Sequence, residues 1–178
     1  MPMRSFVLRP GDVPLLTLAA IGVVFWVSCM IIPHLYAPGT MIHLDGRIGS
    51  MDHMDIWETL DPVSGFFYGF GDIICHQEEA RTAISNGNER FICIRDYNLL
   101  LGAIIGLLGS VAARKDYMGG KWTVICAVLI LLTPVEWMFE HICDIDLATV
   151  RGVCAVLTGG ALGIMLAYLV HRRYESFP

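Results

Sequence analysis

Four long stretches with few or no charged residues constrain this chain more than any other sequence feature. They cover residues 13–36, 97–113, 122–141 and 152–170. A helix that crosses the hydrocarbon core of a bilayer needs about 20 predominantly apolar residues, and each stretch has that length or comes near it. The pattern predicts four transmembrane helices and therefore an all-α, polytopic membrane protein.

The composition agrees with this fold class. Hydrophobic residues make up 55% of the 178 residues and charged residues only 16%, whereas about a quarter of an ordinary soluble domain is charged. The mean hydropathy is +0.59. These values exclude a disordered chain, a coiled coil and a nucleic-acid binder with a basic face, so we expect membrane lipid and no nucleic acid as a partner. The length suits one integral membrane domain over residues 1–178.

Basic residues predict how the four spans are oriented. Arg4 and Arg9 precede the first span, three basic residues lie at positions 114–121 between the second and third spans, and Arg172 and Arg173 follow the fourth. Basic residues are enriched in cytoplasmic loops. We therefore expect a plasma-membrane protein with both termini in the cytoplasm and the long segment 37–96 on the outer side.

A fifth apolar stretch, residues 62–75, is too short for a simple span. It is also interrupted by small residues and one charge, namely Gly65, Gly69, Gly71 and Asp72. We interpret it as a short interfacial or re-entrant helix within the outer segment.

Small residues predict which spans pack together. They recur every four residues in the second span (Gly102, Gly106, Ser110) and in the fourth (Ala155, Gly159, Gly163, Ala167). Small residues let helices approach closely in lipid, and residues four apart share a helix face. Each seam should therefore face a neighbouring helix, and Asn98 and Arg151, at the outer ends of the seams, should point into the bundle.

The third span carries two carboxylates inside its apolar sequence. Glu136 and Glu140 lie four residues apart, after Pro134, which should kink the helix. Charged groups at this depth normally face the interior and have a partner, and Arg151 lies just across a short turn. Glu136, Glu140 and Arg151 are candidate catalytic residues. The alternative is an ion pair that only joins two helices.

Cysteine, histidine and aspartate side chains form a second group of candidates. A metal site could draw on Cys75, His76, Cys93, Asp96 and His141. Thiolate, imidazole and carboxylate ligands together suit zinc, with iron as the less favoured metal. The alternatives are a Cys75–Cys93 disulfide, which an outer segment permits, and unpaired thiols. We expect Cys29, Cys126 and Cys154 to fill the core, and Arg81 and Arg95 to bind an anionic headgroup.

The same residues resemble a family of prokaryotic multi-pass membrane proteins, domain-of-unknown-function family 2085. The resemblance rests on Cys75-His76-Gln77, Arg81, Cys93-Ile94-Arg95-Asp96, Gly102, Pro134-Val135-Glu136 and Arg151-Gly152 with Gly159. It covers roughly residues 66–170. In the family pattern a second cysteine often stands where this chain has Asp96, so the resemblance implies a Cys/His/Asp site here. It implies no activity.

Three functions remain open at this point. The first is a small subunit of a larger membrane assembly or homo-oligomer, with the cysteine cluster as a staple. The second is a membrane-embedded, metal-assisted enzyme acting on a lipid or another amphiphile. The third is an ion transporter or channel. The absence of charged residues from the cytoplasmic half of every predicted span argues against this third function. No hydrolase or phosphate-binding motif is present, so whether the chain is an enzyme stays open.

Overall fold

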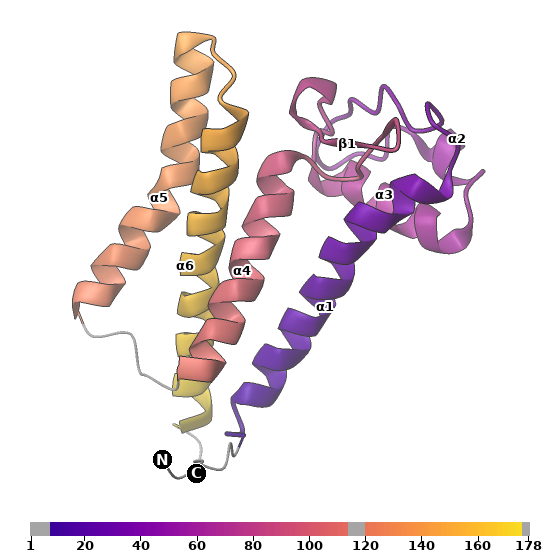
Figure 1. The fold of residues 1–178 in the computed structure, drawn as a ribbon. Helices are drawn as coiled ribbons and strands as arrows, with labels where there is room; N and C mark the ends of the chain where they lie inside the picture. Colours follow the sequence, from indigo (N-terminus) through magenta and orange to yellow (C-terminus); the bar gives the residue numbers. More distant parts are fainter. Residues whose placement is uncertain (1–7, 114–119, 176–178) are drawn as a thin grey trace.

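The computed structural model describes residues 8–113 and 120–175. It consists of a bundle of four long helices and a cap, residues 36–93, at one end of the bundle (Figure 1). The long helices are α1 (Asp12–Ile31, continued by the 3-10 turn η1, Ile32–Leu35), α4 (Ile94–Ala113), α5 (Gly120–Cys143) and α6 (Ala148–Glu175). Arg4, Arg114 and Lys115, which contributed to the predicted orientation, lie outside the described residues.

The four predicted spans are confirmed as helices that are long and apolar enough to cross a membrane. All four start earlier than predicted, α1 and α5 by only one or two residues and the other two by more. Helix α4 begins at Ile94 and α6 at Ala148, before the predicted starts at residues 97 and 152. The charged residues of these first turns, including Arg95 and Arg151, have partners inside the protein, so the helices need not begin after them. Helix α6 also continues past residue 170 through Arg172 and Arg173.

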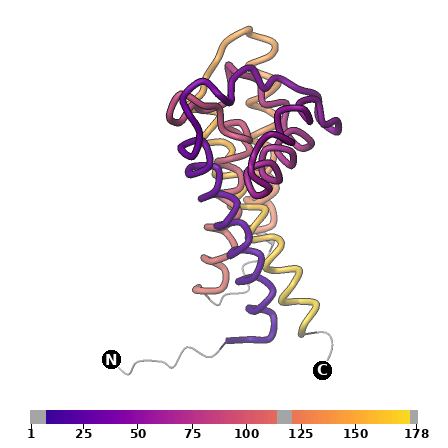
Figure 2. Tube along the Cα trace, turned by 90° about the vertical axis from the view of Figure 1, so that its right-hand side faces the viewer, coloured from indigo at the N-terminus to yellow at the C-terminus, as the bar shows by residue number. Residues whose placement is uncertain are grey.

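The helices are arranged in the order α1, α4, α6, α5, with α4 and α6 in the centre (Figure 1). The beginning of α1 and the end of α6 lie at the same end, where His171 Nε2 is 2.9 Å from Asp12 Oδ1. We call this the terminal end and the opposite one the cap end. Figure 2 shows the cap as a wider head on the bundle.

The two small-residue seams lie against each other in the structure. A Cβ atom added to Gly102 would lie 2.1 Å from the carbonyl oxygen of Val156, and one added to Gly159 would lie 2.0 Å from that of Leu99. Such distances are far below van der Waals contact. Glycine is therefore required on both sides of the α4–α6 contact, because it lets the two backbones touch.

Helix α5 packs mainly on α6 and bends along its length (Figure 1). It contains Pro134, which cannot donate the hydrogen bond of a helical backbone N–H. Near the proline, the Thr158 hydroxyl of α6 donates to the Leu129 carbonyl of α5, and the Thr133 hydroxyl donates to Thr158. These bonds connect the bent part of α5 to α6.

The cap contains two short helices, α2 (Met54–Trp57) and α3 (Pro62–Ile74), a 3-10 turn, η2 (Glu79–Arg81), and a hairpin of β1 (Ile84–Ser85) and β2 (Asn88–Glu89). The hairpin turn is Asn86-Gly87, with both residues at positive φ, as a two-residue hairpin turn prefers. Helix α3 begins at Pro62 after Asp61, whose carboxylate accepts hydrogen bonds from the backbone N–H groups of Val63 and Ser64. It is not among the candidate spans.

The cap has a hydrophobic core of its own, which also holds the end of α1. Tyr68 and Phe91 are fully buried there, with Trp57 and Cys29 beside them. Phe25 of α1 lies 4.8 Å from Phe67, measured between ring centroids. This core fixes the cap on α1 and leads the chain back to the start of α4.

Candidate functional site

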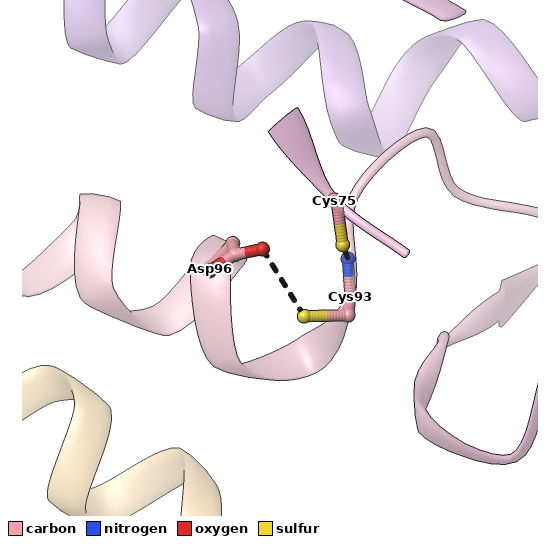
Figure 3. A group of neighbouring side chains, drawn as sticks. All are labelled: Cys75, Cys93 and Asp96. Carbon is pink, nitrogen blue, oxygen red and sulfur yellow. Dashed lines mark hydrogen bonds between the residues drawn. The ribbon is translucent and has the colours of Figure 1, made fainter. Parts of the chain in front are cut away.

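Two thiols and one carboxylate meet where the cap joins α4. The ligand atoms of Cys75, Cys93 and Asp96 all lie within 4.8 Å of one another (Figure 3). The Cys93 thiol donates a hydrogen bond to Asp96 Oδ2 over 3.3 Å, and the Cys93 backbone N–H points at the Cys75 sulfur, also at 3.3 Å. We call these three residues the thiol–carboxylate cluster.

Local structure explains why these three residues converge. Cys93 directly precedes α4, and Asp96, three residues later, shares its side of the first turn. Cys75 ends α3 in an extended conformation, with its N–H bonded to the Gly71 carbonyl. A Cβ on Gly71 would lie only 1.9 Å from the Phe91 carbonyl oxygen. The end of α3 can therefore lie against the segment before α4.

Gln77, the last residue of the Cys-His-Gln motif, holds that contact together. It is fully buried, and its Nε2 donates to the Phe91 carbonyl over 2.8 Å. The bond connects the residue two positions after Cys75 to the residue two positions before Cys93. Gln77 is a positioning residue that the sequence reasoning missed, although its place beside Cys75-His76 was the available signal.

The two thiols differ in acidity. The Cys75 and Cys93 side chains also interact with each other, and a hydrogen bond from the Cys75 thiol to the Cys93 sulfur lowers the pKa of Cys93. The same bond, together with burial, raises the pKa of Cys75. Cys93 is therefore the thiol that ionises first, and the thiolate is the form that binds metals and acts as a nucleophile.

The two histidines of the predicted metal set lie outside this cluster. The chain is extended at Cys75, so neighbouring side chains point to opposite sides. His76 is accordingly exposed, with its Nδ1 3.2 Å from the Gly46 carbonyl. His141 follows Glu140 on α5 and is rotated by about 100° from it. It is exposed and stacks on Trp137, with 5.6 Å between the ring centroids.

All six cysteines are free in the structure. Cys29 and Cys126 are buried, as predicted for core residues, and Cys154 is half-buried. Cys143 is exposed. Cys29 belongs to the same hydrophobic core as Cys75, with Cys93 packed against it, so it is closer to the thiol–carboxylate cluster than its position in the first span indicated.

An ionic network lies beside the thiol–carboxylate cluster, on the bundle side of α4. The predicted pairing of Arg151 with the α5 carboxylates is confirmed: Arg151 Nη2 donates to Glu140 Oε1 at 2.9 Å. Arg151 also bonds Asp146 in the α5–α6 turn. Arg95 Nη2 donates to Glu136 Oε2 at 3.2 Å and lies 3.6 Å from Glu140 Oε2. Arg151, Glu136 and Glu140 are buried.

Three buried atoms of this network have no hydrogen-bond partner in the structure. They are Arg95 Nε, Glu136 Oε1 and Arg151 Nη1. Nevertheless, Arg151 Nε lies 3.9 Å from Glu136 Oε1, so opposite charges are paired throughout. Two guanidinium groups face three carboxylates, so the network has one more acidic group than basic groups.

The arginines predicted to bind an anion are both close to carboxylates. Arg81 Nε is 3.2 Å from Glu78 Oε2, and Arg95 pairs with Glu136. Arg81 also lines a cavity of about 350 Å³ at the cap end, together with Glu140, His141 and Arg151. Three further acidic residues line it, namely Glu78, Asp144 and Asp146. As lined here, this cavity suits a cation or a polar neutral group better than an anion.

Two acidic residues of the outer segment form hydrogen bonds within the cap. Asp72 is fully buried and accepts hydrogen bonds from the Trp57 indole and the His53 backbone N–H. Glu89 is also buried and accepts from the backbone N–H of His43. Burial raises the pKa of Glu89. These carboxylates order the loop before α3, which the acidic composition of the segment did not reveal.

The ligand atoms of the thiol–carboxylate cluster lie close enough together that they could hold a metal ion. With Zn–S and Zn–O lengths near 2.3 and 2.0 Å, a sulfur and an oxygen in a tetrahedral site lie about 3.5 Å apart. The observed Cys93 Sγ–Asp96 Oδ2 distance is 3.3 Å. No positively charged side chain pairs with these ligands among the contacts of the described residues, in contrast to the ionic network.

Comparison with known proteins agrees with the membrane fold. The family model described as "Predicted membrane protein (DUF2085)" matches residues 75–169. The match begins at Cys75 and includes both clusters. No curated protein and no solved structure matches the chain significantly.

Proposed function

Since this chain belongs to DUF2085, a family of predicted membrane proteins, we propose that it is an integral membrane protein in which zinc, bound by Cys75, Cys93 and Asp96, fastens the cap to α4. We propose further that it works as a subunit of a larger membrane assembly or homo-oligomer. The observation that carries the zinc proposal is the spacing of the three ligand atoms, all within 4.8 Å of one another.

Chemistry supports zinc over other ions. Two sulfurs and one carboxylate oxygen are borderline-soft ligands, which zinc accepts and magnesium or calcium does not prefer. The ligands come from the end of α3 and the start of α4. A bound ion would therefore cross-link two segments that otherwise meet through Gln77 and the cap core, and it would balance the negative charge of the thiolates and carboxylate.

The subunit role is supported by helix α5. In its most apolar window only 11% of residues are buried, against 33% for both α4 and α6. Towards the terminal end, α5 leaves an apolar cavity of about 360 Å³, lined by residues such as Ile105, Gly109, Trp122 and Ile125. A helix with so few residues buried by its own chain offers a surface for a neighbouring helix.

The distribution of charge supports an orientation with the cap outside the cell. Arg9, Lys121, Arg172 and Arg173 belong to the terminal end, which the positive-inside rule assigns to the cytoplasm. Cys143, exposed at the cap end of α5, tests this. A membrane-impermeant maleimide should label it in intact cells, and C143S should abolish that labelling. Labelling that requires permeabilised cells would reverse the orientation.

Metal analysis of the purified protein tests the zinc proposal. We expect one zinc per chain in the wild type and in C143S, which removes a thiol away from the cluster, and no zinc in C75S or C93S. D96C should keep zinc because it supplies another thiolate, whereas D96A should lose it. A folded wild type without metal, or a C93S variant that retains it, would refute the proposal. A Cys75–Cys93 disulfide found by non-reducing mass spectrometry would replace it.

The oligomeric state in mild detergent tests the subunit role separately. We expect the chain to purify with a second membrane protein or as a homo-oligomer. A stable, solitary monomer after extraction in mild detergent, with its zinc retained, would refute the subunit role and leave the zinc proposal intact.

A metal-assisted membrane enzyme acting on an amphiphile is the second candidate. It is favoured by the number of ligands, because catalytic zinc usually has three protein ligands and one open position. Zinc bound by these three residues would supply an activated water. The carboxylates that would assist, Glu136 and Glu140, are however engaged by Arg95 and Arg151. A channel has less support, because the 360 Å³ cavity on the terminal side has an apolar lining.

A further inference from the structure

The exposed surface of helix α3 is entirely apolar, and its contact with α1 relates α3 to the depth of the membrane. Its exposed residues are Pro62, Val63, Phe66, Phe70, Ile73 and Ile74, and its two polar residues, Ser64 and Asp72, are buried. Phe66 is 59% exposed. A helix that faced water would carry polar residues on that side, and a contiguous apolar patch marks an interaction surface.

The contact with α1 places α3 at the depth of lipid chains. Phe25 of α1 packs against Phe66, Phe67 and Phe70 of α3. It lies six residues before Ile31, where α1 ends, which is about 9 Å along the helix. The 20-residue α1 is about as long as the hydrocarbon core is thick. Phe25, and α3 with it, therefore lies in the cap-side half of that core.

The apolar surface of α3 is continuous with that of α1 and contains a groove. Ile21, which is 56% exposed, shares a face of α1 with Phe25, so the lipid-facing stripe of α1 leads to α3. Between α2 and α3 lies a groove of about 460 Å³, lined by Met51, Met54, Trp57, Leu60, Phe66 and Phe70 among others. Glu58 is the one charged residue of its lining.

From this position and lining we propose that the groove between α2 and α3 binds an acyl chain of a phospholipid from the cap-side leaflet. Lipid is the occupant because hydrocarbon chains surround α3 at this depth and because the exposed surface of α3 offers no polar side chain to a protein partner. The flexible Met51 and Met54 side chains suit a chain of variable shape. This inference depends on the membrane depth of α3 and not on the zinc proposal.

Quenching of Trp57 fluorescence tests the proposal, because Trp57 lines the groove and is 4% exposed. The full chain with Trp26, Trp122 and Trp137 replaced by phenylalanine is reconstituted in vesicles of phosphatidylcholine with brominated or unmodified acyl chains. We expect bromination to reduce Trp57 emission at least as much as it reduces that of a second variant retaining only Trp122, which lies in a candidate span. Aqueous acrylamide should have little effect on Trp57.

Two substitutions connect the quenching to the groove itself. In G69L the added side chain meets Trp57 and Met51, whose atoms lie 3.7–4.0 Å from a Cβ at this position. It should fill the groove and remove most of the bromine effect. V63L adds bulk on α3 outside the groove lining and should leave the effect unchanged. If the triple tryptophan variant does not fold, the difference between wild type and W57F gives the same contrast.

Three results would overturn the proposal. Quenching by acrylamide but not by brominated lipid would place the groove in water. Quenching by neither would mean that hydrocarbon chains do not enter the groove. An undiminished bromine effect in a folded G69L variant would mean that lipid approaches Trp57 by another route.

Discussion

The first turn of α4 lies between two clusters that differ in whether their acidic groups have positively charged partners. Cys93 and Asp96 face the cap and meet Cys75, so this side collects ligands that are negative when ionised. Arg95 faces α5 and α6 and meets Glu136 and Glu140, so this side collects both signs. Two guanidinium groups therefore partner the carboxylates on one side, and no cationic side chain partners the ligands on the other among the contacts of the described residues. If the proposed zinc binds, a metal site and an internal ion network lie within one turn of helix.

The largest expected effect comes from breaking the ionic network. R151M leaves Glu140, which is 3% exposed, without its main counter-ion. Removing one partner of a buried pair costs about 3–5 kcal/mol. D146N is the matched control, because the Asp146 side chain is 60% exposed and exposed pairs contribute about 0.2–1 kcal/mol. Equilibrium unfolding in mixed detergent micelles measures both.

The same R151M variant sharpens the comparison between the clusters. If the two are independent, its zinc content should equal that of the wild type, measured on protein that is still folded. An R151M variant no less stable than D146N would mean that the ionic network does not stabilise the fold. Loss of zinc from folded R151M would mean that the two clusters form one site.

Metal removal should have the next largest effect, and only through the thiol–carboxylate cluster. Zinc at 100 times its dissociation constant should stabilise the folded wild type by about 2.7 kcal/mol relative to the metal-free protein. The unfolding free energy with and without a chelator measures this difference. C93S should unfold identically in both conditions, and C143S should behave as the wild type does. A chelator effect that persists in C93S would place the metal elsewhere.

The sequence predicted those contacts that follow from the membrane itself. A charge within a span needs a partner, which identified the pair of Arg151 and Glu140. Small residues at four-residue spacing identified the packing faces of α4 and α6, which include Gly102 and Gly159.

The cap could not be predicted in the same way, because its order depends on pairs far apart in the sequence. Asn88 donates to the carbonyls of Pro33 and Ala37 and accepts from Met41. Gln77 reaches Phe91. No local period signals such bonds, since each depends on where the whole loop folds. The sequence therefore indicated the thiols of the cluster but not the amide side chains that bring the segments together.

Replacing Arg95 should lower the unfolding free energy by a smaller amount. It tests whether Arg95 belongs to the ionic network or to the thiol–carboxylate cluster. R95M removes a hydrogen bond between two charged groups, 3.2 Å long, and leaves Glu136 with Arg151 Nε at 3.9 Å. We expect a loss of about 1.5 kcal/mol in unfolding free energy. Zinc content should not change, although Arg95 is adjacent to Asp96. A drop in zinc without a loss of stability would assign Arg95 to the thiol–carboxylate cluster instead.

The smallest effect concerns a third kind of carboxylate, one stabilised by hydrogen-bond donors alone. Asp61 accepts from the backbone N–H groups of Val63 and Ser64 and from the Tyr36 hydroxyl, and its pKa is lowered to about 2 by bonds from Ser64 and Tyr36. Because its folded pKa is below the unfolded one, Asp61 stabilises the cap fully above pH ~4, and this contribution is lost as pH falls towards 2.

D61N isolates this contribution, because asparagine caps a helix about as well as aspartate but does not ionise. The wild type should have the higher unfolding midpoint at neutral pH, and the two midpoints should converge between about pH 4 and pH 2. Thermal unfolding in detergent across that range measures the convergence. Parallel curves would show that the Asp61 charge contributes nothing and that its capping hydrogen bonds act equally well from a neutral side chain.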